Sequence, residues 1–135
     1  MKYLTLLSLI FILFSCDPEQ EAATPDPSIT PPEWIRGSWT YTDSSNYTEN
    51  LIISEDDIVH ERLLSTGKKS ISYMDSCKEY SISVNQEIKY NSYFHIKFTD
   101  KNDSINLLYL AKIAGDEIRV IDEKSPTPKS YIKVK

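Results

Sequence analysis

The sequence predicts an all-β domain, built as an antiparallel up-and-down meander of about eight strands that closes into a small barrel. Apolar and polar residues alternate with the period of two that is typical of half-buried strands. Short polar turn signals separate these segments. No window of twelve residues carries the apolar stripe of a helix. The connections require antiparallel neighbours, because parallel strands need crossovers of a dozen or more residues.

The N-terminus predicts a lipoprotein signal peptide over residues 1–15. Lys2 is followed by an apolar run, and Ser15 is the small residue expected before a cleavage point. The run is shorter than the roughly 20 residues of a spanning helix. Leu13-Phe14-Ser15-Cys16 resembles the bacterial lipobox, which implies that Cys16 is the acylated first residue of the mature chain. An ordinary signal peptide with an incidental cysteine is the alternative.

Acylation of Cys16 implies a membrane partner and a place in the bacterial cell envelope. More than one acyl chain gives stable anchoring. The acidic residues Asp17, Glu19 and Glu21 resemble signals that route some lipoproteins across the outer membrane. We therefore expect an outer membrane lipoprotein, and the sequence leaves open whether it faces the periplasm or the cell surface. Cys77 is then the remaining thiol, which we expect to be buried.

Residues 16–32 are predicted to be the lipidated cysteine and a disordered tether. Residues 17–32 contain five of the seven prolines and four carboxylates but no aromatic residue. Such a composition cannot bury enough apolar surface to offset chain entropy. The folded domain is accordingly expected over residues 33–135.

The charge of this domain argues against nucleic acid as a partner. The whole chain has a formal charge of −5, but residues 33–135 carry 16 acidic and 14 basic side chains. The domain is thus nearly neutral, and no basic stripe interleaved with aromatic residues is present.

Period-two alternation and turn signals place the strands along this domain. Turn signals occur at 54–57, 65–69, 100–103, 114–117 and 125–128. The strands are expected near 35–43, 48–54, 57–63, 79–84, 92–99, 104–112, 117–122 and 129–134, with a further candidate in 69–75.

The first strand carries a motif, Gly37-Ser38-Trp39, that resembles the Gly-x-Trp motif of lipocalins. The resemblance implies a lipocalin-like barrel of the calycin type, with the glycine allowing a tight bend and the tryptophan sealing one end. Lipocalins usually add a C-terminal helix and an arginine that stacks on the tryptophan. This chain lacks room for that helix, and only Arg119 or Lys133 can supply the cation. An avidin-type barrel and a β-sandwich remain open.

A barrel of eight strands either fills itself with side chains or holds one small ligand. The first functional hypothesis is therefore a carrier that binds a small apolar or amphipathic molecule in the barrel or at its mouth. The alternation predicts that Leu107, Ile132 and Val134 point into the barrel. The ligand-pocket candidates are the aromatic residues on those phases: Trp39, Tyr41, Tyr80, Phe94, Phe98 and Tyr109.

The second hypothesis is a protein-interaction module, such as a hydrolase inhibitor or an accessory subunit of a surface complex, with a filled barrel. Tyrosine is enriched at interfaces. The candidates are the tyrosines expected on loops or outward phases: Tyr47, Tyr73, Tyr93 and Tyr131. The sequence leaves the oligomeric state open.

The sequence offers no candidate metal ligands, cofactor site or catalytic residues. His60 and His95 stand at unrelated positions, and no Cys or His spacing suits zinc. His95 lies on the polar phase of its strand. A nucleophile elbow and a phosphate-binding glycine loop are both missing, with three glycines in the chain. We therefore expect a binding protein rather than an enzyme.

Overall fold

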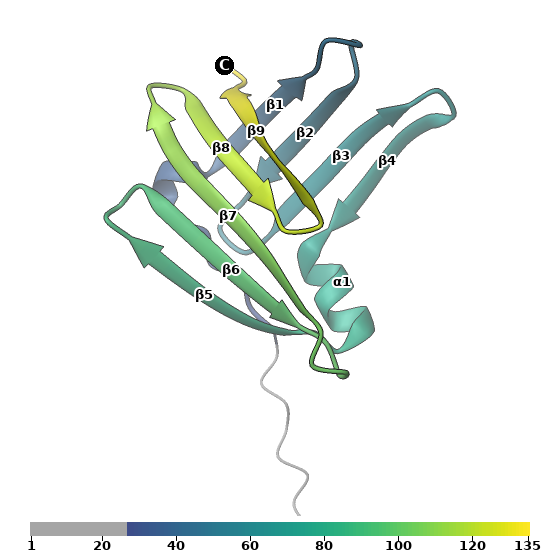
Figure 1. Ribbon diagram of the computed structural model, residues 1–135, viewed down its shortest axis with the longest axis vertical. Coiled ribbons are helices and arrows are strands. Elements are labelled where there is room, and N and C mark those ends of the chain that lie inside the picture. Colours follow the sequence, from purple (N-terminus) through teal and green to yellow (C-terminus); the bar gives the residue numbers. More distant parts are fainter. Residues whose placement is uncertain (1–26) are drawn as a thin grey trace, which may run out of the picture.

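The computed structural model describes residues 27–135, and these form a single antiparallel β-sheet with one short α-helix (Figure 1). Signal peptide, Cys16 and the first part of the predicted tether lie outside the described residues. The strands are β1 (Gly37–Thr42), β2 (Thr48–Ile53), β3 (Ile58–Leu64), β4 (Gly67–Ser72), β5 (Ser83–Lys89), β6 (Tyr93–Thr99), β7 (Ile105–Ala114), β8 (Glu117–Asp122) and β9 (Ser125–Lys133). A 3-10 turn, η1 (Glu33–Ile35), precedes β1, and α1 (Tyr73–Tyr80) joins β4 to β5. The predicted all-β meander is confirmed.

Aspartate residues shape two of the turns that separate the strands. In the β1–β2 turn, Asp43 Oδ1 accepts hydrogen bonds from the backbone N–H groups of Ser45 and Tyr47, at 2.8 and 3.0 Å. Asp100 does the same in the β6–β7 turn for Asn102 and Ser104, at 2.8 and 2.9 Å. Asp and Asn side chains stabilise turns by bonding to the backbone a few residues on. These local bonds explain why the turn at 100–103 was readable from the sequence, and the β1–β2 turn, which was not among the predicted turn signals, uses the same chemistry.

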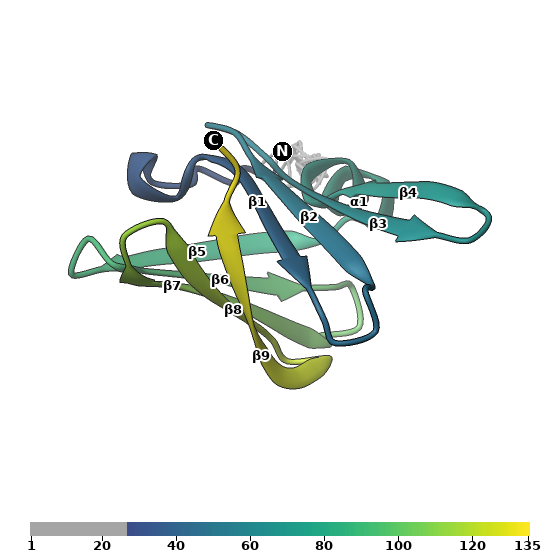
Figure 2. The ribbon, with the colours of Figure 1, turned by 90° about the horizontal axis from the view of Figure 1, so that it is seen from above.

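The sheet curls into a barrel that is only partly closed. Its strand order is β4-β3-β2-β1-β9-β8-β7-β6-β5, so strands consecutive in the chain are neighbours except β4 and β5. The curl is completed by pairing of β1 with β9, where Val134 donates to the carbonyl of Ser38 at 2.8 Å. Strands β4 and β5 are the two edges, and α1 lies at the opening between them (Figure 2). The predicted barrel thus has a lateral opening that the sequence did not indicate.

The helix α1 at this opening was not predicted. Ser72 begins it as the N-cap, with its Oγ accepting from Asp75 N–H at 2.9 Å, and Ser81 ends it in the left-handed conformation at φ 53°. It has eight residues, of which only Cys77 is buried, so it has no apolar stripe long enough to detect. The strand expected at 79–84 therefore begins later, as β5. Among the described residues, no helix has the length and apolar character needed to cross a bilayer.

The N-terminal boundary of the folded domain also differs from the prediction. Ile29 is 2% exposed and Pro31 is buried, and both belong to the interior together with Ile35. The backbone N–H of Thr30 donates to Gln86 Oε1 on β5 at 2.8 Å, and the Gln86 amide donates back to Thr30 Oγ1 at 2.9 Å. The domain therefore includes residues 29–31, which lie inside the stretch expected to be a tether. Prolines do not prevent packing here, since the segment packs without joining the sheet.

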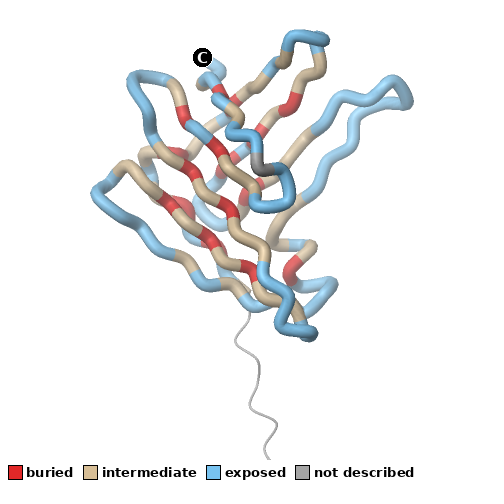
Figure 3. The backbone as a smooth tube through the Cα atoms, in the orientation of Figure 1, coloured by how far each residue is buried: buried red, intermediate tan, exposed pale blue. Residues whose placement is uncertain are grey.

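The inward faces of two strands are the opposite of those predicted. On β7, Leu108 and Leu110 are buried, whereas Leu107 and Tyr109 lie on the other face. On β9, Tyr131 is buried and Ile132 is 50% exposed. Both faces of β7 are largely apolar, so the alternation there does not select one. The register with β8 is continuous from Leu108 to Lys112 and shifts only at a bulge between Lys112 and Ala114, beyond the buried leucines. Figure 3 shows how buried positions alternate with intermediate ones along the central strands.

Candidate functional site

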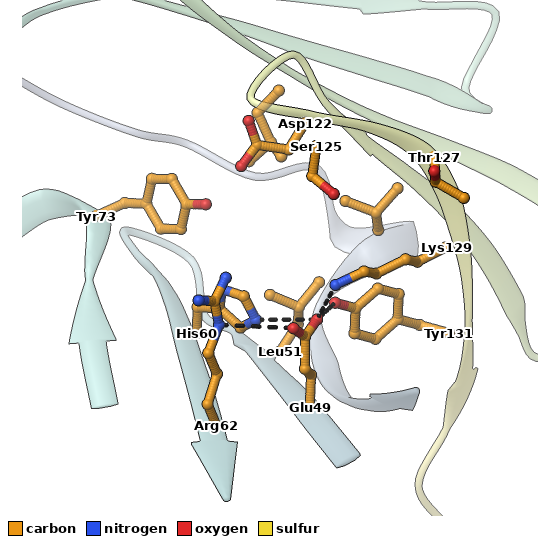
Figure 4. A pocket seen from close by; sticks show the side chains of 12 residues that line it. Glu49, Leu51, His60, Arg62, Tyr73, Asp122, Ser125, Thr127, Lys129 and Tyr131 are labelled. Atoms are coloured by element: carbon orange, nitrogen blue, oxygen red, sulfur yellow. Dashed lines mark hydrogen bonds and ion pairs between the residues drawn. The ribbon is translucent and has the colours of Figure 1, made fainter. Parts of the chain in front are cut away.

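A buried carboxylate, Glu49, organises a polar cluster on the concave side of the sheet (Figure 4). It follows the same inward phase of β2 as Leu51 and Ile53, and it is 2% exposed. Lys129 Nζ and the Tyr131 hydroxyl, both from β9, each donate to Glu49 Oε2 at 2.8 Å. Glu49 therefore joins β2 to β9 across the interior.

Two residues of β3 complete this cluster from the opposite side. His60 Nε2 lies 3.3 Å from Glu49 Oε2, and Arg62 Nε lies 3.5 Å from Glu49 Oε1. Neither contact has hydrogen-bond geometry. His60 Nε2 is buried without a hydrogen-bond partner among residues 27–135. Arg62 is 45% exposed at its side chain. The Arg62 guanidinium thus has capacity to bind a further group.

The electrostatics of the cluster hold Glu49 ionised and His60 neutral. Burial opposes ionisation of Glu49, but the bonds from Lys129 and Tyr131 outweigh it and lower the Glu49 pKa to about 2. Burial lowers the pKa of His60 and outweighs the attraction of Glu49. Burial, with the bond to Glu49, raises the pKa of Tyr131 well above its usual range. A carboxylate with so low a pKa is a poor general base near neutral pH, so the cluster is better suited to binding than to proton transfer.

Two cavities adjoin this cluster. The smaller, about 40 Å³, lies against Glu49 and has room for a few water molecules. The larger, about 270 Å³, opens between α1, the β3–β4 hairpin and the β6–β8 part of the sheet. We call the larger cavity the lateral cleft, because it coincides with the opening between β4 and β5. Both cavities are lined by His60, Arg62, Tyr73 and Asp122.

The lateral cleft is apolar at depth and charged at its mouth. Its apolar lining is formed by Ile71, Cys77, Ile82 and the ring of Phe98. Phe98 and Cys77 are buried, whereas Arg62 and Lys124 reach solvent. Asn106 also lines the cleft, and its Oδ1 is buried without a hydrogen-bond partner in the described part of the chain. Buried polar atoms are normally satisfied, so this acceptor and His60 Nε2 are exceptions among the groups beside the cleft.

Tyr73 and Cys77 bring α1 into the cleft. The Tyr73 ring packs against Phe98 with centroids 5.5 Å apart. Burial, with Asp122 nearby, raises the pKa of Tyr73 to about 12, so its hydroxyl remains a donor. Burial, with Asp57 nearby, raises the pKa of Cys77 to about 11, which keeps the thiol protonated. The expected burial of Cys77 is confirmed, at 1% exposure.

The six predicted ligand-pocket residues do not form one site. Phe98 lines the cleft, and Tyr41 lies beside the Glu49 cluster, 5.6 Å from the Tyr131 ring. Trp39 and Phe94 are buried in the core and line neither cavity. Tyr80 and Tyr109 were misplaced by the predicted strand phases. Tyr80 is 60% exposed at the end of α1, and Tyr109 lies on the outer face of β7.

Trp39 is buried in the core, and a cation lies over its ring. Its indole N–H donates to the carbonyl of Ile35 at 2.7 Å, and Lys133 Nζ lies 5.2 Å from its ring centroid. Lys133, rather than Arg119, is thus the cation over the tryptophan. Gly37 has φ +129°, and an added Cβ there would lie 3.0 Å from Lys133 Cε, so the glycine permits this packing.

The four tyrosines predicted to form an interaction surface also lie in different environments. Tyr131 is buried at 2% exposure, which contradicts its predicted surface role. The reason is that β9 turns Lys129 and Tyr131 inward, where Glu49 accepts a hydrogen bond from each of them. Tyr73 points into the cleft, and Tyr47 lies beside Glu49, where burial raises its pKa. Only Tyr93 lies on the outer face of the sheet, across from Ala111.

Sequence reasoning missed Glu49, Arg62 and Lys129 as site residues. The signal for Glu49 was available, since it continues the inward phase of Leu51 and Ile53. Arg62 gave an ambiguous signal, because each phase of β3 carries a charged residue, Glu61 on one and Arg62 on the other. Lys129 gave no signal, because its side chain points inward only through the register of β9. Within residues 27–135, no group of three or more His, Cys, Asp or Glu residues is arranged to hold a metal ion.

The comparisons with known proteins leave the site to be interpreted from its own geometry. No family model matches the chain, no curated protein matches it, and no solved structure matches it. Fold and site together define a small, barrel-like β domain with a lateral cleft beside a buried charge cluster.

Proposed function

We propose that this chain is an envelope lipoprotein that binds a small amphipathic ligand in the lateral cleft. The observation that carries the proposal is the cleft itself. Its volume of about 270 Å³ is close to the lower end of small-molecule sites, about 300 Å³. An apolar interior with a few polar groups at the mouth suits a ligand that has an apolar body and a polar end.

The resemblance of Leu13-Phe14-Ser15-Cys16 to the lipobox supports anchoring through acyl groups on Cys16. Cell fractionation of Cys16→Ser tests this part. The variant is expected in the soluble fraction, while Cys77→Ala should stay with the membrane because Cys77 is buried in the folded domain. Continued membrane partitioning of Cys16→Ser would show that Cys16 is not the anchor.

Ligand binding is tested by native mass spectrometry of protein purified from its own host. Wild type is expected to carry a small molecule. Ile71→Trp, which fills the cleft, should lose that molecule, and Ile52→Trp should keep it. The two isoleucines form a matched pair, since each is 38% exposed on a strand and only Ile71 lines the cleft. Equal occupancy in the two variants would count against the cleft.

A protein-interaction module is the second candidate, and one observation favours it. Tyr93, His95 and Tyr109 gather on the outer face of β6 and β7, with the His95 and Tyr109 rings stacked 4.5 Å apart and the two tyrosine rings 6.0 Å apart. Aromatic clusters of this kind are enriched at interfaces. A consistently ligand-free protein in native mass spectra would favour this candidate over the carrier.

A further inference from the structure

We propose that the ligand of the lateral cleft carries a negative charge at its polar end, held by Arg62 and Lys124. This inference rests on the proposed function and names the chemical class of its ligand, an organic anion with an apolar body. It follows from three observations: an accessible arginine at the mouth of the cleft, the balance of charges around the cleft, and the apolar lining at its depth.

Arg62 stands at the mouth of the lateral cleft. On β3 it shares the concave face with His60, and across the ladder it faces Lys69 of β4. Its side chain is 45% exposed, so the guanidinium keeps contact with water and is accessible to a ligand. An arginine fork at the rim of an apolar cleft is suited to hold the charged end of a ligand.

Glu49 does not account for this arginine. Its Oε2 already accepts short bonds from Lys129 and Tyr131, both at 2.8 Å, whereas Arg62 approaches Oε1 only at 3.5 Å through Nε. Within residues 27–135, Arg62 donates no side-chain hydrogen bond. A guanidinium has five N–H donors in a fork that matches a carboxylate or a phosphate. Figure 4 shows the Arg62 guanidinium beside His60, on the side of the site from which Tyr73 approaches.

The remaining charges around the cleft favour an anion. Lys124, in the β8–β9 turn, lines the cleft together with Arg62, and Lys69 lies across the ladder from Arg62. Asp122 is the one carboxylate that lines the cleft among the described residues. Since Lys129 balances Glu49, the cleft keeps an excess of positive charge. Tyr73 adds a protonated hydroxyl beside these cations.

The apolar depth of the cleft specifies the rest of the ligand. Phe98, Ile82 and Cys77 provide no charge, and Cys77 is protonated near neutral pH. An inorganic anion would leave this surface uncovered, so the fit is to an anion with an apolar chain or ring. The charged end then lies at the mouth and the apolar part lies against α1.

Isothermal titration calorimetry with three matched probes tests the inference: decanoate, 1-decanol and decylammonium. The protein is the mature chain with Cys16→Ser, which avoids detergent. Decanoate is expected to bind at least tenfold more tightly than decanol, and decylammonium more weakly than either. Arg62→Gln should weaken decanoate binding about tenfold, as expected when a charge-assisted hydrogen bond is lost. The affinity of Arg62→Gln for decanol should equal that of the wild type.

Lys124→Gln keeps the test valid if Arg62→Gln disturbs folding, because Lys124 is exposed in a turn. It should weaken decanoate binding severalfold, and Lys101→Gln, an exposed lysine of another turn, should not. Equal binding of decanoate and decanol, or tighter binding of decylammonium, would overturn the inference while leaving the proposed function in place. Failure of all three probes to bind would overturn the proposed function and the inference together.

Discussion

Glu49 shows how a single residue ties distant parts of this chain together. It is separated from Lys129 by 80 residues and from Tyr131 by 82, yet both donate hydrogen bonds to it. A buried charge is costly unless it is paired and hydrogen-bonded. The interior of this domain meets that condition only when β2 and β9 lie on facing sides of the curled sheet.

Replacing this carboxylate by an amide should make stability less dependent on pH. The Glu49 pKa is about 2 in the folded chain and 4.5 without the fold, so its contribution is present above pH 4.5 and is lost as pH falls towards 2. The free energy of unfolding of the wild type should exceed that of Glu49→Gln by on the order of 3 kcal/mol at pH 7. This difference should shrink by about 2 kcal/mol at pH 3. Urea unfolding of both proteins at a series of pH values measures the difference.

Glu87→Gln is the control for this experiment. Glu87 is 52% exposed and pairs with Lys89 at 3.3 Å on the edge strand β5. Because surface ion pairs contribute little, its removal should change the unfolding free energy by less than about 0.5 kcal/mol. A pH-independent difference between wild type and Glu49→Gln would show that the buried carboxylate is not held ionised by its neighbours.

At the scale of elements, α1 depends on a side chain outside it. Asp57, in the β2–β3 turn, accepts from Ser72 Oγ at 2.6 Å and from Met74 N–H at 3.0 Å. Ser72 is the N-cap of α1, so Asp57 orients the cap and satisfies a free N–H of the first turn. Since α1 lies beside the lateral cleft, this contact positions Tyr73 and Cys77 in it.

Asp57→Ala should destabilise the domain by about 1 to 2 kcal/mol, the range for loss of a helix cap. The rate of amide hydrogen exchange in α1 should also increase in this variant, because the first turn loses its acceptor. Glu55→Ala, in the same turn and exposed, serves as the matched control and should leave both measurements unchanged. Unaltered protection of α1 in Asp57→Ala would mean that the helix is held by its packing alone.

At the scale of the whole molecule, the domain needs the segment that leads into it. Ile29 packs in the same core as Ile35 and Ile58, while Thr30 bonds to the edge strand β5. The sheet is open at that edge, so the segment covers apolar surface that a closed barrel would not expose. The proposed tether from Cys16 is therefore shorter than the composition suggested.

Ile29→Ala should lower the unfolding free energy by about 2 to 4 kcal/mol, as for other fully buried isoleucines. Ser28→Ala, its exposed neighbour, should have little effect. Denaturant unfolding compares the two, with an unchanged slope expected for a loss of stability alone. If both variants unfold at the wild-type midpoint, residues 27–32 are not part of the core.

Much of the fold was predictable because the signals are local. Alternation placed β2, β3, β6 and β8 within about a residue of their bounds, and aspartates marked the turns. The face of β7 was not predictable, because both of its faces are apolar. Helix α1 was missed because its stability comes from Ser72 and from Asp57, which is distant in the chain.

The candidate site was predicted much less well, since most of its residues act through partners on other strands. Phe98 was found from its strand phase alone. Arg62 and Lys129 were not, because a charged side chain inside a sheet is explained only by the group that it meets. Tyr131 was placed outside for the same reason, although its hydroxyl is satisfied by a buried carboxylate.

The sequence by itself determined that the chain is an antiparallel β domain and where most of its strands begin and end. These features depend on periodicity, turn chemistry and composition, which act over a few residues. The tertiary structure decided which faces point inward, that the sheet stays open between β4 and β5, and that Glu49 meets Lys129 and Tyr131. Those outcomes depend on the pairing of β1 with β9, a long-range contact whose register no local pattern specifies.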